Sequence, residues 1–497
     1  MKKKKELIII LGSLLVVVLS VSIAYFSATI NSKNSNVSTS SAELKIVFTS
    51  GTGTIAGSEI EPGWSSGVNT FTVKNQSNGT YKYNIVIKDL INTFVTTGYL
   101  QYKITSTDGG YNMSDFKDVP KSTSATDKVL AYSVEIAKGA THTYSVEFRY
   151  LNSTTVNQNE DMGKKLSGTL FIEEGTTEPI PFYNKLLADN PTIQTRSSFS
   201  AIFTTTNTGT LYKATESIAG STAKDVHYFA GDAKNNWVKF AGFYWRIIRT
   251  NHDGSVRLLY SGTATNTTEG YIGKSAFNSS YNNPMYVGYM YGTTGNLASN
   301  RTNENNSTIK GVIDTWYSNN LSSYSKYIST EAVYCNDREL AAGSTYSTTY
   351  SGFYYAAYTR LYTNKTPTYN CTNIKDAFSG SNSEAKLTYP IGLMTADEIT
   401  YAGGYRYNNL TSPYAWYYLN SAGGSITGSM HWRLLSPDAW AHAYAYSWIV
   451  RGSYNPGSLG SDFVTSSYGV RPVISINGDT QSFGDGSPEN PYEIIYN

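Results

Sequence analysis

HWRLLSP at residues 431–437 and YGVRPVIS at residues 468–475 enclose a segment with almost no charge and an unusual number of aromatic side chains. Each flanking motif combines apolar residues with an arginine, which is the composition of a rigid frame. We expect the arginines to form buried, charge-assisted hydrogen bonds to loop carbonyls or carboxylates. The frame then displays the enclosed segment, residues 438–468. The frame residues are Trp432, Arg433, Arg471 and Pro472.

The displayed segment alternates strictly between aromatic and small side chains over residues 439–450. In one continuous strand, this alternation places the aromatic residues on one face and the alanines on the other. An outward row of rings can bind a flat or amphipathic ligand, but the same rings can also pack on neighbouring strands. The residues predicted to contact a ligand are Trp440, His442, Tyr444, Tyr446, Trp448, Arg451, Tyr454, Asn455, Asp462 and Phe463.

The N-terminus predicts export. Lysines occupy positions 2–5 and precede an uncharged apolar run at 7–25, which as a helix nearly spans the ~30 Å hydrocarbon core of a bilayer. Small residues at 22 and 24 fit a signal-peptidase site, so residues 1–28 are either a cleaved signal peptide or an uncleaved signal-anchor. In both cases we expect the rest of the chain, with its C-terminus, to lie outside the cell.

The composition argues against a nucleic-acid interface. Only 15% of residues are charged and the formal net charge is +2, so the chain lacks the clustered basic residues that phosphates require. The chain contains 43 tyrosines, together with many Asn, Ser, Thr and Gly residues. These residue types recur in recognition surfaces, although exported β-rich proteins in general share them.

The only two cysteines, Cys335 and Cys371, predict one disulfide, because an exported chain with an even cysteine count usually pairs them. The bridge would close a tyrosine-rich loop and stabilise the fold by about 3–4 kcal/mol. The alternative is a reactive thiol, which would need a basic neighbour to lower its pKa.

The pattern of the chain predicts two domains after a polar tether at 29–42. Apolar and polar residues alternate at 70–74, 81–87 and 144–150, which indicates half-buried strands of an all-β sandwich over 43–174. A proline-containing linker at 175–181 ends this pattern.

Residues 182–497 mix strands with a few short helices, which predicts an α+β domain. Ser307 is a plausible cap for a helix with apolar residues at helical spacing. Thr395 and Glu398 fit a capping box at the start of another helix.

The N-terminal half resembles the camelysin and biofilm-fibre family of Gram-positive surface proteins. This resemblance covers about residues 1–175 and implies extracellular assembly or matrix association, including self-assembly through the sandwich. The matching runs are AYF (24–26), FTVKN (71–75), MGK (162–164) and LSGTLF (166–171).

The C-terminal half resembles the C-type-lectin-like fold in its formylglycine-generating-enzyme branch, and more closely domains of gut-bacterial surface proteins. Some relatives in this branch are diversified by retroelements between the last two motifs, which implies a variable segment at 438–468. The matching runs are FYWRII (243–248), YCNDR (334–338), YPIGLMTADE (389–398), WRLLSP (432–437) and GVRPV (469–473).

The chain lacks the features that this resemblance would require of an enzyme. No cysteine follows Cys371, and only His431 and His442 lie near the frame, so we expect no catalytic residues, no metal and no cofactor. Asp397 and Glu398 could form a catalytic pair, but helix capping explains them better.

We therefore expect a non-catalytic, exported surface protein whose aromatic segment binds an unknown protein or glycan. One alternative is a structural biofilm-matrix or fibre protein with a capping C-terminal domain. Another is a diverged oxidase or metal-dependent enzyme of the same fold.

Overall fold

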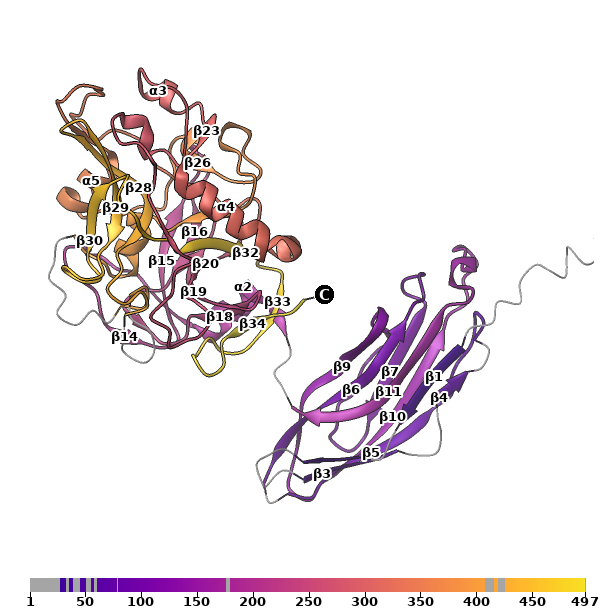
Figure 1. The fold of residues 1–497 in the computed structure, drawn as a ribbon. Coiled ribbons are helices and arrows are strands. Elements are labelled where there is room, and N and C mark those ends of the chain that lie inside the picture. The colour runs from indigo at the N-terminus through magenta and orange to yellow at the C-terminus, as the bar shows by residue number, and fades with distance from the viewer. Residues whose placement is uncertain are drawn as a thin grey trace, which may run out of the picture. The chain divides into compact units, whose positions relative to one another are not determined.

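The computed structural model describes residues 60–77, 79–175, 179–406, 415–418 and 425–496, together with the backbone of four N-terminal strands (Figure 1). The described chain is mostly β-sheet. It forms two compact units, Met1–Glu178 and Pro179–Asn497, and each is described here by itself. Within the described ranges no helix is long and apolar enough to cross a membrane, and the apolar run at 7–25 lies outside those ranges.

The first unit contains two sheets. All of their strand pairs are antiparallel except β1 with β11, which is parallel. One sheet has the order β4 (Ile55–Gly57), β1 (Ser27–Ser32), β11 (Lys165–Glu174), β6 (Tyr81–Asn92) and β9 (Ser122–Ile136). The other has the order β2 (Ser35–Ser38), β3 (Lys45–Ser50), β5 (Asn69–Asn75), β10 (Thr141–Tyr150), β7 (Leu100–Ser106) and β8 (Lys117–Asp118), and a 3-10 turn, η1 (Asn159–Asp161), precedes β11.

The two sheets share one hydrophobic core. Phe71 of β5 and Phe148 of β10 pack in the same cluster as Ile85 of β6 and Leu170 of β11. The alternation predicted at 70–74, 81–87 and 144–150 lies in β5, β6 and β10. Buried and more exposed residues alternate in β5 and β10 as expected, whereas residues 83–87 of β6 are all buried, so this part of β6 is covered on both faces.

The segment expected to be a tether contributes strands instead. Residues 27–32 pair with β11, and residues 35–38 pair with β3. Their serine-, threonine- and asparagine-rich sequence lacks a hydrophobic alternation, and sequence patterns detect strands chiefly through that alternation.

The second unit is built on an 11-stranded sheet (Figure 1). A meander of β18, β19 and β20 forms its centre, and the turn residues Asp253 and Gly254 join the last two. Its path is β12 (Ile180–Pro181), β33 (Gln481–Phe483), β34 (Tyr492–Ile494), β18 (Trp237–Phe240), β19 (Phe243–Thr250), β16 (Lys224–Tyr228), β15 (Thr210–Glu216) and β13 (Thr192–Gln194). β20 (Val256–Tyr260) pairs with both β19 and β32 (Pro472–Ile476). β32 also pairs with β27 (Gly392–Leu393).

A six-stranded sheet carries the segment between the two frame motifs. Its order is β21 (Lys274–Ser275), β31 (Tyr468–Gly469), β28 (Trp432–Ala441), β29 (Tyr444–Val450) and β30 (Leu459–Phe463), and β25 (Phe353–Tyr354) also pairs with β28. Three short ladders complete the strands: β14 (Thr206–Asn207) with β17 (Asp232–Ala233), β22 (Met290–Tyr291) with β23 (Asn305–Asn306), and β24 (Tyr334–Cys335) with β26 (Ala377–Phe378).

Two helices of the second unit, α4 (Thr308–Asn320) and α6 (Ala396–Ala402), begin where the sequence predicts caps. The Ser307 hydroxyl accepts a hydrogen bond from the Lys310 N–H, and Thr395 and Glu398 form a complete capping box. The α-helices are α2 (Phe182–Asp189), α3 (Leu297–Asn300), α4 (Thr308–Asn320), α5 (Ala356–Tyr358) and α6 (Ala396–Ala402). The other helical turns are η2 (Pro284–Val287), η3 (Ser322–Tyr327), the π-helix η4 (Thr359–Asn364), η5 (Ile374–Asp376) and η6 (Ser383–Ala385).

Candidate functional site

The aromatic segment turns back on itself. β28 ends at Ala441 and β29 begins at Tyr444, and only His442 and Ala443 lie between them. Both turn residues have positive φ, 54° and 63°, as in a type I′ hairpin turn. The prediction of one continuous strand over residues 439–450 is therefore wrong.

The turn changes which side chains share a face. Residues directly opposite in neighbouring strands lie on the same face, and Trp440 is opposite Ala445. Trp440 is accordingly fully buried on the inner face, where its indole N–H donates to the Thr349 carbonyl at 2.8 Å. Its assignment as a ligand-binding residue is wrong, because the hairpin reverses its direction relative to the tyrosines of β29.

Within β29 the expected alternation is present. Ala445 is buried on the inner face, whereas Tyr444 and Tyr446 are partly exposed on the outer face. Trp448 shares the outer face by its spacing but is fully buried: it belongs to the hydrophobic core of the unit, and the Arg406 guanidinium lies 4.6 Å from its ring centre. Trp448 is therefore covered in this structure and not displayed as predicted.

The outward-facing positions continue across four strands, although Ala439, which joins Tyr354 to Tyr446, is only 4% exposed. Tyr354 of β25 is opposite Ala439 of β28, and Ala439 is opposite Tyr446 of β29. Tyr446 is in turn opposite Phe463 of β30. The two ends of this row are open to solvent, since Tyr354 is 43% exposed and Phe463 is 36% exposed. The row therefore joins segments that are far apart in sequence.

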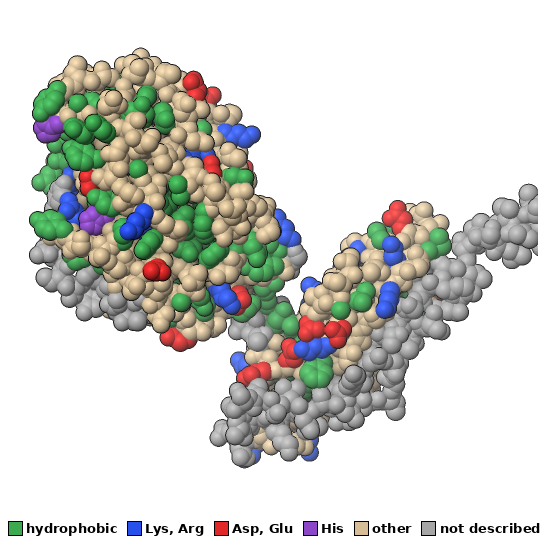
Figure 2. Space-filling view, viewed as in Figure 1, with side chains coloured by type: hydrophobic (Ala, Val, Ile, Leu, Met, Phe, Trp, Pro, Cys, Tyr) green, Lys and Arg blue, Asp and Glu red, His purple; other side chains and the backbone are tan. Residues whose placement is uncertain are grey.

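Further rings extend the row. Tyr281 stacks on Tyr444 with ring centres 4.5 Å apart and planes 9° apart. The Phe463 ring lies 4.8 Å from the rings of both Tyr444 and Tyr446. Hydrophobic side chains gather along the edge of the unit where Figure 1 places β28–β30 (Figure 2). We call Tyr281, Tyr354, Tyr444, Tyr446 and Phe463 the aromatic face.

Three predicted binding residues lie away from this face. Arg451, Tyr454 and Asn455 belong to the turn that joins β29 to β30, at the opposite end of these strands from Tyr444. Tyr454 is 69% exposed. Asn455 has a positive φ of 50°, and its carbonyl accepts hydrogen bonds from the Ser458 N–H and hydroxyl, so it shapes the turn.

The two remaining predicted residues border the aromatic face. The Asp462 carboxylate accepts hydrogen bonds from the Phe463 N–H at 2.7 Å and from the Tyr468 hydroxyl. The carboxylate is therefore hydrogen-bonded within its own loop. His442 is exposed at the hairpin tip, with its ring centre 5.3 Å from that of Tyr350.

The buried side chain of Arg433 holds the loop that follows β30, next to the aromatic face. The residue is fully buried and donates hydrogen bonds to the Ser447 hydroxyl at 2.9 Å and to the carbonyls of Phe463 and Ser466. Burial lowers the pKa of its guanidinium to about 10. The loop that carries Phe463 is thus anchored to β28, as expected of a frame residue.

The second frame motif is buried in the same manner. Arg471 is fully buried, and it donates to the carbonyls of Tyr260 at 3.1 Å and Tyr417 at 2.6 Å. Its guanidinium lies 4.7 Å from the Trp432 ring centre. Burial, followed by the charge of Arg246, lowers its pKa to about 9. Pro472, at the start of β32, is also buried.

The predicted disulfide is present between Cys335 and Cys371. The segment that it closes includes β25 and therefore supplies Tyr354 to the aromatic face. Sequence reasoning missed Tyr354 and Tyr281, because neither lies in a segment with a clear alternation. The tyrosine content of the disulfide loop was the one available signal.

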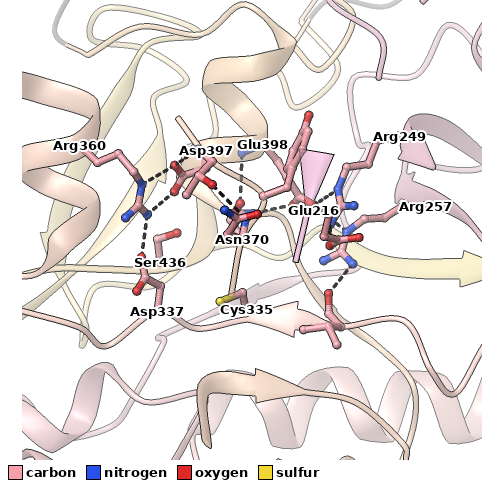
Figure 3. Close-up of a pocket in the computed structure, with 14 residues that line it drawn as sticks. Glu216, Arg249, Arg257, Cys335, Asp337, Arg360, Asn370, Asp397, Glu398 and Ser436 are labelled. Carbon is pink, nitrogen blue, oxygen red and sulfur yellow. Dashed lines mark hydrogen bonds and ion pairs between the residues drawn. The ribbon is translucent and has the colours of Figure 1, made fainter. Parts of the chain in front are cut away.

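A second candidate site is a small polar cavity beside α6 (Figure 3). It measures about 20 Å³, which is room for about one water molecule. Charged side chains from several elements line it: the carboxylates of Glu216, Asp337, Asp397 and Glu398, and the guanidinium groups of Arg249, Arg257 and Arg360.

The carboxylates on one side of this cavity are paired with arginines. Arg249 lies 2.8 Å from Glu216 and 3.1 Å from Glu398, and Arg257 lies 2.8 Å from Glu398. Although burial alone would raise it, Arg249 and His252 lower the pKa of Glu216 to about 2. This cluster ties β15, β19 and β20 to α6.

Arg360 bridges the carboxylates on the other side, at 2.7 Å from both Asp337 and Asp397 (Figure 3). Asp397 also accepts a hydrogen bond from the Thr368 N–H at 3.0 Å. Burial raises the pKa of Asp337, and Arg360 offsets that increase only in part. Asp397 is thus paired with Arg360, and Glu398 belongs both to the arginine cluster and to the capping box. The cavity that these side chains line is too small for a substrate larger than water.

In the part of the chain that the structure describes, no three His, Cys, Asp or Glu side chains lie close enough together to hold a metal ion. Comparisons with protein-family models, with curated proteins and with solved structures found no match.

Proposed function

We propose that this chain is a non-catalytic, exported binding protein that holds its ligand on the aromatic face. The observation that carries the proposal is the row of partly exposed rings across β25, β29 and β30, backed by fully buried frame residues. Exposed tyrosine and phenylalanine rings on a rigid support supply contact area at a small entropic cost.

Rigidity distinguishes this face from scattered surface aromatics. Phe463 is anchored through its carbonyl to the buried Arg433, and Tyr444 is stacked on Tyr281. Rings that are already ordered lose little side-chain entropy when a ligand binds. In this proposal the second unit is a C-type-lectin-like scaffold, and the first unit is a sandwich of the camelysin type that carries it on the cell surface or in the matrix.

Export is part of the same proposal. Its support is the lysine cluster at 2–5, the apolar run at 7–25 and the disulfide between Cys335 and Cys371. Disulfides persist in oxidising compartments and are rare in the cytosol.

The test compares the full chain with a triple variant, Tyr444→Ala/Tyr446→Ala/Phe463→Ala, on glycan and protein arrays. Truncating three central contact residues is expected to weaken binding by at least about tenfold. The melting temperature of the variant should stay close to that of the parent, because all three rings are partly exposed.

Tyr454→Ala is the matched control, because Tyr454 is an exposed tyrosine at the other end of the same two strands. It should bind like the parent. Binding that survives in the triple variant, or that is lost equally in the control, would contradict a role for the aromatic face.

The alternative function is that of a structural fibre protein. The observation that favours it is β9, a 15-residue strand that forms one edge of its sheet. Under this alternative the full chain would sediment as a concentration-dependent polymer and would bind nothing on the arrays.

A further inference from the structure

The turn that joins β29 to β30, residues 451–458, is held to the rest of the second unit through Gly452. The Gly452 N–H donates a hydrogen bond to Nδ1 of His431 at 2.9 Å, and the Gly452 carbonyl accepts one from the Tyr418 hydroxyl at 2.7 Å. A Cβ added at Gly452 would lie 2.4 Å from two backbone oxygens of residues 429–430. The backbone of the turn therefore packs directly on the residues that precede His431.

The hydrogen bond to His431 requires a neutral ring. A backbone N–H can only donate, so Nδ1 must offer a lone pair and the ring proton must lie on Nε2. Protonation would place a proton on both ring nitrogens, and two N–H donors would then face each other. The bond between His431 and Gly452 is therefore lost when the ring takes up a proton.

The groups that surround His431 come from four parts of the unit. Arg451 belongs to the turn, and Arg433 belongs to β28, which begins directly after His431. Asp462 belongs to β30, and Tyr468 of β31 has its ring centre 5.1 Å from that of His431. Burial, followed by the charge of Arg451, lowers the pKa of His431. The Asp462 carboxylate opposes this effect and Arg433 adds to it, so the charged ring is disfavoured overall.

The lowered pKa fixes the sign of the pH dependence. Because the folded-state pKa of His431 lies below its ordinary value of 6.5, the unfolded chain binds more protons between the two values. The stabilisation from His431 is complete above about pH 6.5 and is lost as the pH falls through the folded-state pKa. The tyrosine hydroxyls that donate to the carbonyls of Gly452 and Gly457 stay protonated in this range. Mild acid thus breaks the His431 contact and leaves the two tyrosine contacts in place.

From these observations we infer that His431 is a pH-sensitive latch: the neutral ring holds the 451–458 turn through Gly452, and the protonated ring releases it. The turn carries Tyr454, which is 69% exposed, so its release changes a solvent-exposed surface of the unit. This inference goes beyond the proposed function. The turn lies at the opposite end of β29 and β30 from Tyr444, and the latch acts whatever the aromatic face binds.

Hydrogen–deuterium exchange of the full chain at about pH 7.5 and about pH 5 tests the latch, with exchange times scaled for the intrinsic pH dependence of amide exchange. Peptides that cover residues 451–458 should lose protection by about tenfold at the lower pH, because a hydrogen bond is lost and a positive charge is added beside two arginines. Peptides from β20, whose residues are all buried, are the internal reference and should keep their protection.

Two glutamine variants locate the response. His431→Gln supplies a side-chain carbonyl that can accept the Gly452 N–H and does not titrate. Its turn should be equally protected at both pH values or, if the shorter contact is not made, equally unprotected at both. His442→Gln removes an exposed histidine at the hairpin tip and should keep the response of the parent.

Three results would overturn the inference. The first is a turn that is equally protected at both pH values in the parent chain. The second is a response that persists in His431→Gln. The third is a loss of protection at the lower pH that extends equally to β20, because it would show unfolding of the unit in place of release of the turn.

Discussion

Two residues at a turn decide which side chains of the aromatic segment meet solvent. His442 and Ala443 both adopt positive φ. Such turns usually contain asparagine or glycine, and neither residue type is present here. The alternation on either side of them is intact. Trp440 therefore lies with Ala445 on the inner face, and Tyr444 lies on the outer face.

This arrangement predicts opposite consequences for two aromatic substitutions four residues apart. Trp440→Ala should destabilise the second unit by about 3–5 kcal/mol, because it removes a fully buried indole and leaves a cavity. Tyr444→Ala should cost less than about 1 kcal/mol, because its ring is partly exposed and rests on another surface ring.

Urea denaturation of the two variants measures this contrast. Similar free energies of unfolding for Trp440→Ala and Tyr444→Ala would contradict the hairpin and would favour the single strand expected from the alternation.

At the scale of elements, β28 connects the frame to the rest of the second unit. Its residues from Trp432 to Trp440 are all buried, so both of its faces are covered, and it pairs with β25, β29 and β31. The side-chain amide of Asn336 donates to the Leu435 carbonyl at 2.8 Å and so ties the strand to the disulfide-closed segment. An apolar strand with an inward arginine is what this environment requires.

The disulfide should contribute strongly to the stability of the second unit. The two cysteines are 36 residues apart, and removing a crosslink that closes a loop of this size costs about 4 kcal/mol in the chain-entropy model. We expect Cys335→Ser/Cys371→Ser to lower the urea midpoint of the second unit accordingly.

The same measurement on the parent chain with a reductant provides the control. The reduced parent should unfold close to the double variant, and a parent whose midpoint does not respond to a reductant that is shown to free both thiols would contradict the stabilising role.

At the scale of the whole molecule, the surface is less charged than the composition suggests. Several arginines of the second unit lie in its interior, where they bond to carbonyls and carboxylates or stack on tryptophan rings. The fully buried arginines are Arg257, Arg338, Arg433 and Arg471. A chain with only 15% charged residues thus places some of its charges in the interior of the second unit.

Internal charges also link stability to pH. The pKa of Glu216 is lowered from 4.5 to about 2 in the folded state, so the unfolded state binds more protons between these values. The stabilisation is complete above about pH 4.5 and is lost as the pH falls towards 2. Glu216→Gln should therefore destabilise the second unit by about 3–5 kcal/mol at pH 7, because it leaves the buried Arg249 and Arg257 to share one carboxylate, Glu398.

Thermal unfolding of the parent and Glu216→Gln from pH 7 to pH 2.5 checks this expectation. The gap between their melting temperatures should narrow only below about pH 4.5. A gap that stays constant over the whole range would show that the Glu216 charge does not stabilise the fold.

Local sequence is enough to predict the strands at 81–87 and 144–150, the capping box at Thr395 and Glu398, and the disulfide. These features depend on periodicity, on short-range hydrogen bonds or on the only two cysteines in the chain, all of which local sequence records.

Which rings face solvent depends on long-range packing. The positive φ angles at His442 and Ala443 reverse the chain, Arg406 covers Trp448, and β25 brings Tyr354 into a row with Tyr446. Each of these depends on contacts between segments that are distant in sequence, or on a turn whose residues carry no strong preference for it. Strand period specifies two faces, but packing against the rest of the chain determines which of them stays open.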